Sequence, residues 1–224
     1  MIQTRGILDR ELTEIQDRLL QIGGMVEQAI RRSIEALKNQ DVDLAQQIIA
    51  DDQKINKLRY KMEEHCLAVI ATQQPVAGDL RFIIAAMHIA IEMERMADHA
   101  GGIAQLVPRL AKEPLLKPLI DVPRMAELAC EMLNASLDAF MDRDVKAAKA
   151  AAKRDNKMDQ LYDQVFRELL TYMLQDPRNI NRATFLLWVA HNLERIGDRV
   201  TNVSERVVFM ATGKLKELDG SWKK

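Results

Sequence analysis

Acidic side chains four residues apart occur at matching places in the two halves of this 224-residue chain. The pairs are Glu94 with Asp98 and Glu194 with Asp198, and on a helix the members of each pair lie on one face. Like charges at this spacing repel, and a bound cation would offset the repulsion. Carboxylate and amide oxygens are the ligands of hard and borderline metal ions. We therefore predict a metal-binding face on both helices, extended by Asn202 on the second.

A second set of oxygen ligands precedes each of these pairs. Asp52 and Asn56 in the first half, and Asp155 and Asp159 in the second, show the same four-residue spacing. If the helices that carry them run antiparallel beside the helices of the glutamates, the two faces can join. Four or more oxygens would then converge in each half, which suits a divalent or trivalent metal ion.

Solvated helix faces are the alternative explanation for these residues. Arg95 and Arg195 each precede an aspartate by three residues, which is the spacing of ordinary surface ion pairs. The duplication favours the metal hypothesis, because chance rarely places matching acidic pairs at equivalent positions. His99 and His191 could each add a nitrogen ligand, although scattered histidines are more often surface or packing residues.

Apolar residues spaced by three and four predict long helices, and hence an all-α fold. The composition agrees, because aromatic residues make up 4% of the chain and the six prolines fall where the periodic pattern breaks. The clearest apolar seam belongs to the last helix and consists of Leu186, Val189, Leu193, Ile196, Val200, Val203, Val207 and Met210. The predicted helices span residues 8–39, 42–73, 78–108, 122–141, 145–174 and 179–213.

The chain repeats itself with an offset of about 100 residues. Asp41 and Asp144 both occupy places expected of helix N-caps, and they are 103 residues apart. Glu94 and Glu194 are 100 residues apart, so three residues were lost from a loop between these points. Two tandem three-helix bundles follow. We place the first repeat at 1–110, a proline-containing linker at 111–122, the second repeat at 123–213 and a tail at 214–224.

The bulk composition argues against several classes of protein. A net charge of -1 provides no broad attraction for nucleic acid or for an anionic membrane. Cys66 and Cys130 lie far apart and outside any CxxC spacing, so neither a disulfide framework nor a thiolate zinc site is expected. The longest apolar stretch, residues 82–93, is too short to cross a membrane, and the N-terminus lacks the apolar segment of a signal peptide. We expect a reducing compartment, and if the protein works at a membrane we expect it to do so through a partner.

The duplicated acidic segments resemble the signatures of the PhoU family. They read ERMAD at 94–98 and ERIGD at 194–198, and the second continues as ERIGDRVTN through Asn202. The resemblance extends from Leu8 to about Met210. It implies a PhoU-like fold of six helices in two similar bundles, with a spectrin-repeat-like architecture, in a cytoplasmic and often dimeric protein.

The resemblance also implies a non-enzymatic role in phosphate homeostasis. Similar proteins negatively regulate the phosphate-starvation response and modulate the phosphate ABC transporter, with its ATPase subunit and a sensor histidine kinase as partners. Family members bind multinuclear clusters on their outer surface, of iron or of other metals such as zinc, nickel or another divalent ion. The residues that carry over are Glu94, Asp98, Glu194 and Asp198, with Asp52, Asp155 and Asp159 as helpers.

Two departures from this pattern distinguish the first half from the second. Gly102 occupies the place of Asn202, and Asn56 occupies that of Asp159. The first half therefore has fewer oxygen ligands to offer. We expect it to hold metal less tightly than the second half, or to hold a different number of ions.

Three other functions remain open from the sequence. A di-metal oxidoreductase of the ferritin type would need Glu-x-x-His motifs facing the bundle interior, and no glutamate here has a histidine three positions later. A signalling function would make His99 or His191 a phosphoacceptor, but no nucleotide-binding glycine loop accompanies either residue. A metal-independent helical adaptor would instead dock its acidic faces on basic partner surfaces.

Overall fold

Helices follow one another along nearly all of residues 2–218, which are the residues that the computed structural model describes. This range contains no β-strand, and the predicted all-α class is confirmed. In chain order the helices are α1 (Ile2–Asn39), α2 (Val42–Gln73), α3 (Ala77–Leu110), α4 (Asp121–Met141), α5 (Val145–Lys153), α6 (Asp155–Gln175), the short 3-10 helix η1 (Pro177–Asn179) and α7 (Ile180–Thr212).

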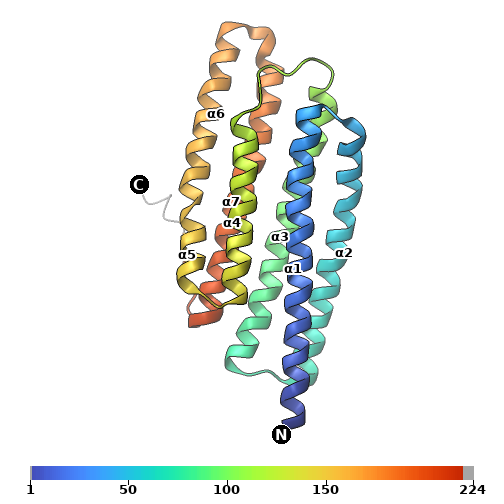
Figure 1. The fold of residues 1–224 in the computed structure, drawn as a ribbon, viewed down its shortest axis with the longest axis vertical. Coiled ribbons are helices and arrows are strands. Elements are labelled where there is room, and N and C mark those ends of the chain that lie inside the picture. The colour runs from blue at the N-terminus through green and yellow to red at the C-terminus, as the bar shows by residue number, and fades with distance from the viewer. Residues whose placement is uncertain (1, 219–224) are drawn as a thin grey trace.

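The helices form two three-helix units that lie side by side (Figure 1). The first unit contains α1, α2 and α3, and the second contains α4, α7 and the α5–α6 pair, which together take the place of one long helix. The most extensive contact between the units is that of α3 with α7, which run antiparallel, and α1 packs on α4 beside them. The outer edges are formed by α2 and by α5–α6. The predicted pair of bundles is therefore confirmed, and the two halves pack into one elongated molecule.

Both apolar seams are buried between the helices. The predicted seam of α7 is buried along its whole length, and so are the residues of α3 that lie 100 positions earlier. Phe82 of α3 stacks on Phe140 of α4, with ring centroids 5.1 Å apart. Burying side chains of this size contributes roughly 1.5–3 kcal/mol each, so these seams hold the bundle together.

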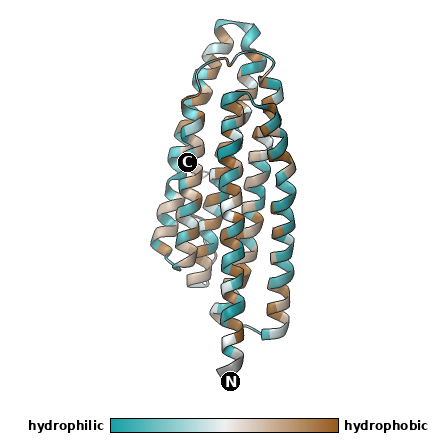
Figure 2. Cartoon of the chain, turned by 45° about the vertical axis from the view of Figure 1, so that its right-hand side comes forward, coloured by the Kyte–Doolittle hydropathy of each residue, from teal (hydrophilic) through white to brown (hydrophobic). Residues whose placement is uncertain are grey.

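Hydrophilic and hydrophobic residues alternate along the outer helices, as Figure 2 shows. Such alternation around each helix is typical of amphipathic helices with one face toward a core and one toward water. Within residues 2–218, none of the helices is both long enough and apolar enough to cross a membrane.

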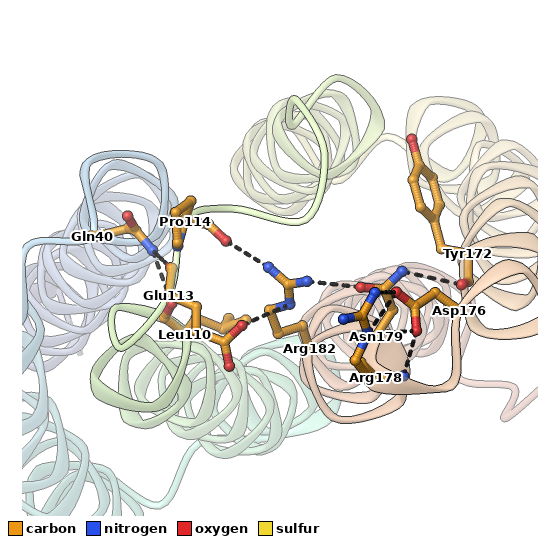
Figure 3. Close-up of polar contacts among 9 residues, drawn as sticks. All are labelled: Gln40, Leu110, Glu113, Pro114, Tyr172, Asp176, Arg178, Asn179 and Arg182. Atoms are coloured by element: carbon orange, nitrogen blue, oxygen red, sulfur yellow. Dashed lines mark hydrogen bonds and ion pairs between the residues drawn. The ribbon is translucent and has the colours of Figure 1, made fainter.

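The connection between the two units is held at one end of the molecule by side chains from both of them (Figure 3). Gln40 Nε2, just after α1, donates to the carbonyl oxygens of Leu110 and Glu113, each at 2.8 Å. Arg182 Nη1 of α7 donates to the carbonyl oxygen of Pro114 at 3.3 Å, and Arg182 Nε lies 3.3 Å from a carboxylate oxygen of Glu113. The connecting segment is thus fixed against both units.

The two predicted N-caps are confirmed. The Asp41 side chain accepts a hydrogen bond from the backbone N–H of Leu44, and the Asp144 side chain accepts from those of Lys146 and Ala147. Each carboxylate thereby satisfies backbone donors that would otherwise lack a partner at the start of a helix.

The prediction of one helix over residues 145–174 is wrong, because two helices occupy this range. Arg154 interrupts it in a turn that separates α5 from α6, and the guanidinium of Arg154 pairs with Glu131 of α4. The interruption places Asp155, which is buried, in the first turn of a new helix. That position favours an acidic side chain, because the unpaired N–H groups and the helix dipole are positive there.

Two smaller departures concern helix ends. The first helix begins at Ile2, six residues before the predicted start. Pro108 lies inside α3 although prolines were expected only where helices break. Pro108 lies in the last turn, two residues before the helix ends at Leu110. A proline cannot donate a backbone hydrogen bond, and the loss of one bond is tolerated at the end of a helix.

Candidate metal-binding carboxylate clusters

The first cluster consists of Asp52 and Asn56 from α2 with Glu94 and Asp98 from α3. Burial raises the pKa of the Asp52 carboxyl, and the negative charge of Asp98 raises it further. Burial likewise raises the pKa of Glu94, followed by the charge of Asp98 and, more weakly, that of Asp52. Three carboxylates on two helices therefore act on one another electrostatically. The tertiary structure brings together the two oxygen-bearing faces of this half.

Unpartnered oxygens lie within this first cluster. Asn56 Nδ2 donates to Asp52 Oδ2 at 3.1 Å. Asp52 Oδ1 and Asn56 Oδ1 are buried and have no hydrogen-bond partner among the residues that the structure describes. A buried acceptor without a donor costs roughly 1–3 kcal/mol. Two such oxygens beside acidic side chains fit a bound cation, which would satisfy the acceptors and offset the repulsion.

Arg59 is a residue of this region that the sequence analysis missed. Its guanidinium lies 3.9 Å from a carboxylate oxygen of Glu94, and it also pairs with Glu63 at 2.6 Å. Arg59 lowers the pKa of Glu94 in opposition to the larger effects of burial and Asp98. Its position 35 residues before Glu94 gave no sign of this contact, because only the packing of α2 on α3 creates it.

The second cluster consists of Asp155 and Asp159 from α6 with Glu194 and Asp198 from α7. Burial raises the pKa of Glu194 to about 7, helped by the charge of Asp198 and, more weakly, that of Asp159. His191 Nδ1 lies 3.4 Å from Glu194 Oε2, one turn away on the same helix. The second half thus repeats the arrangement of the first, with a more strongly perturbed glutamate.

The ordinary ion pair expected of a solvated face is present in one half only. Arg195 Nη1 lies 2.8 Å from Asp198 Oδ2. In the first half Arg95 pairs instead with Glu92, at 3.2 Å. The explanation by solvated helix faces therefore accounts for part of the second cluster. It does not account for the burial of the first cluster or for its unpartnered oxygens.

The ligand atoms of the two clusters are spread more widely than one ion requires. Oxygen ligands of a single ion at ordinary bond lengths lie within about 3–5 Å of one another. Among residues 2–218, three such atoms from His, Cys, Asp or Glu come within 4.8 Å of one another only at Glu11, Glu14 and His65. Each predicted cluster would therefore need side-chain rotation, or several ions, to coordinate fully.

Comparison with known proteins now decides the family. The model of the PhoU domain matches the chain twice, over residues 19–107 and 122–207. The chain belongs to the PhoU family. It is 40% identical over 208 residues to the phosphate-specific transport system accessory protein PhoU homolog of Aquifex aeolicus, covering 93% of this chain and 94% of that protein. The homolog of Clostridium acetobutylicum is 38% identical, with 96% and 99% covered.

Two solved PhoU structures share the architecture. The crystal structure of PhoU from Pseudomonas aeruginosa superposes with a TM-score of 0.86 at 34% identity, covering 92% of this chain and 99% of that one. The phosphate transport system regulatory protein PhoU from Streptococcus pneumoniae gives a TM-score of 0.87 at 31% identity, covering 93% and 99%. The predicted PhoU-like fold is confirmed.

Asn202 makes a contact between the two PhoU domains. Its Nδ2 donates to Glu92 Oε2 of α3 at 3.1 Å, and Arg199 Nη1 lies 3.4 Å from the same oxygen. His99 Nδ1 lies 3.0 Å from Asn192 Oδ1 of α7. Two residues proposed as ligands thus contact the opposite domain, Asn202 through Nδ2 and His99 through Nδ1. Glu92, which the sequence analysis missed, anchors this contact.

Gly197 lies where α6 and α7 make close contact in the second cluster. A Cβ atom at this position would lie 2.6 Å from Asp155 Oδ1 and 3.2 Å from Met158 Cγ. Any larger residue at position 197 would therefore require the side chains of Asp155 and Met158 to shift. The first domain has the buried Ala97 at the equivalent position, where α2 runs without interruption past Asp52.

Replacing Gly197 by alanine should destabilise the protein by about 1–3 kcal/mol, because the new methyl group overpacks the contact between α6 and α7. Urea unfolding followed by circular dichroism measures the change. Gly101→Ala is the matched control, because a Cβ atom there meets nothing within 4 Å. In a helix interior that change should stabilise by up to about 1 kcal/mol. Equal midpoints for the two variants would refute the close approach.

Proposed function

We propose that this protein is a non-enzymatic regulator of phosphate uptake and homeostasis. The observation that carries the proposal is the match of both halves to the PhoU domain. Relatives that align with more than nine-tenths of the chain are named phosphate-specific transport system accessory proteins, and the pneumococcal structure is described as a phosphate transport system regulatory protein. These names describe accessory and regulatory proteins.

The proposed partners are the ATPase subunit of the phosphate ABC transporter and a phosphate sensor histidine kinase. In this proposal the protein acts in the cytoplasm as a homodimer, reaches the membrane only through these partners and negatively regulates the phosphate-starvation response. An exposed apolar stripe on α6 supports protein binding, because such patches mark interaction surfaces. It consists of Phe166, Leu170 and Leu174, which are 43%, 42% and 78% exposed.

Metal bound at the two carboxylate clusters is the proposed modulator of these interactions. Iron is the expected ion, with zinc, nickel or another divalent ion as alternatives. Support comes from the raised pKa values of Glu94 and Glu194 and from the unpartnered buried oxygens of Asp52 and Asn56. The Arg195–Asp198 ion pair favours the competing proposal of a metal-independent adaptor. Partner binding that survives a strong chelator would support the adaptor.

Deleting the gene should raise phosphate uptake and phosphate-responsive transcription in phosphate-rich medium, because the negative regulator is lost. Uptake of labelled phosphate and a reporter of phosphate-responsive transcription measure the two effects. Expressing the wild-type chain should reverse both. Leu174→Glu should reverse them less well than Gln21→Glu, which adds the same charge at another exposed position on α1. Unchanged uptake and transcription in the deletion strain would refute the proposed function.

A further inference from the structure

A third group of metal-ligating side chains lies between α1 and α2, away from both carboxylate clusters. Glu11 and Glu14 are three residues apart on α1 and so share a face, while His65 comes from α2. One ligand atom of each lies within 4.8 Å of the other two. His65 Nε2 lies 2.7 Å from Glu11 Oε2. The group therefore joins two helices through donors of two chemical types.

The histidine ring is fixed with one nitrogen toward the carboxylates. The His65 side chain is 14% exposed, and its Nδ1 is buried with no hydrogen-bond partner among the described residues. The ring therefore makes its polar contact through Nε2, with Glu11. Packing thus holds the ring in place, and little reorganisation is needed to offer Nε2 to an ion.

The two carboxylates have little other positive charge to neutralise them. Glu11 Oε1 lies 3.8 Å from Arg10 Nη2, and the Arg10 side chain is mostly exposed. Glu14 is exposed and makes no ion pair or side-chain hydrogen bond with the rest of the described chain. Glu14 therefore offers an unpaired carboxylate beside the His65–Glu11 pair. Together the three side chains form a set of donors suited to a cation.

We propose that Glu11, Glu14 and His65 bind a divalent cation of borderline character, of which Zn²⁺ is the type case. Imidazole nitrogen and carboxylate oxygens are accepted zinc ligands, at about 2.0–2.2 Å. Tetrahedral angles at those lengths separate the donor atoms by roughly 3.4 Å, so the His65–Glu11 contact would open by well under 1 Å. Three protein ligands leave a fourth position for water on the exposed side of Glu14. The site lies outside the duplicated acidic segments: Glu11 and Glu14 precede the first match to the PhoU domain, residues 19–107, and His65 lies within it.

Zinc titration separates this site from the carboxylate clusters. The titration uses a Glu94→Gln, Glu194→Gln background, which removes a glutamate from each cluster. Zn²⁺ is followed by isothermal calorimetry, and Co²⁺ by visible absorption, which is strong for an ion held in tetrahedral coordination and weak for the hydrated octahedral ion. One equivalent of each ion should bind the background protein. Adding Glu14→Gln should weaken binding by about tenfold or more, and His65→Gln should abolish the cobalt absorption band.

The control is His88→Gln, which removes an exposed histidine from α3. It should leave both titrations unchanged. Helicity by circular dichroism checks folding, and Glu14→Gln tests the site even if His65→Gln disturbs packing, because Glu14 is exposed. The proposal is overturned if the background protein binds neither ion, or if binding survives both Glu14→Gln and His65→Gln undiminished. Neither result bears on iron bound at the carboxylate clusters, so this proposal and the proposed function fail separately.

Discussion

Replacing Glu194 by glutamine should stabilise the metal-free protein by about 1–3 kcal/mol at pH 8 and leave its stability nearly unchanged near pH 4. The cause is the pKa of Glu194, which burial and the charge of Asp198 raise from 4.5 to about 7 in the folded protein. A carboxyl whose pKa is raised by folding binds its proton more tightly in the folded state. Its ionisation therefore opposes folding.

The sign of the pH dependence follows directly. Below pH 4.5 the carboxyl of Glu194 is protonated in both states and costs nothing. As the pH rises from 4.5 to about 7, the unfolded chain loses this proton first and the wild-type protein becomes less stable. Above about pH 7 the full penalty is present. Glutamine has a similar shape and no charge, so it avoids the penalty at every pH.

Urea unfolding from pH 4 to pH 8, in the presence of a chelator, measures this difference between Glu194→Gln and wild type. Glu35→Gln is the control, because it removes an exposed glutamate from α1. Its stability curve should run parallel to that of wild type. If the Glu194→Gln curve were parallel as well, the glutamate would ionise as readily in the fold as in the unfolded chain. A divalent ion that binds the second cluster should remove much of the wild-type penalty at pH 8.

Loss of bound metal is the second large effect that we expect. Wild-type protein purified from iron-supplied cells should retain iron or another metal, and Glu94→Gln with Glu194→Gln should lower the retained metal by more than about tenfold. The physical reason is that each substitution removes an anionic ligand from the centre of a cluster. Inductively coupled plasma mass spectrometry gives the metal content per chain.

The matched control for metal content is Glu35→Gln with Asp138→Asn, which removes two exposed carboxylates from α1 and α4. It changes the net charge as much as the test variant does, so it separates ligand loss from general electrostatics. The two single glutamate variants rank the sites, and Glu194→Gln should lose more metal than Glu94→Gln. Substoichiometric metal in wild type and variants alike would leave the clusters as solvated or protein-docking faces.

The helices were the most predictable part of the structure. Five of the six apolar-periodic stretches matched single helices closely, and the stretch over residues 145–174 covered both α5 and α6. Local spacing suffices for this, because it decides which face of a helix is apolar. The N-caps Asp41 and Asp144 were predictable for a similar reason, since a cap acts on backbone within three residues of itself. The break at Arg154 was not visible in the apolar spacing, which continues from α5 into α6, and the pairing of Arg154 with Glu131 of α4 forms only in the folded chain.

The candidate site was predictable only along each helix. The four-residue spacing showed that Glu194 and Asp198 share a face, and the duplication related them to Glu94 and Asp98. Residue spacing did not reveal every contact that these residues make with neighbouring helices. Asn202 contacts Glu92 of the other domain, a pairing that spans 110 residues of sequence.

The sequence by itself determined the all-helical class, the internal duplication and the presence of two acidic faces, because these depend on periodicity within a single chain segment. The tertiary structure decided which helix faces meet and in what axial register. It raised the pKa of Glu194 by burial, and it placed His65 beside Glu11 although 54 residues separate them. The reason is that helix packing fixes the axial register between neighbours, whereas residue spacing fixes only the direction in which a side chain leaves its own helix.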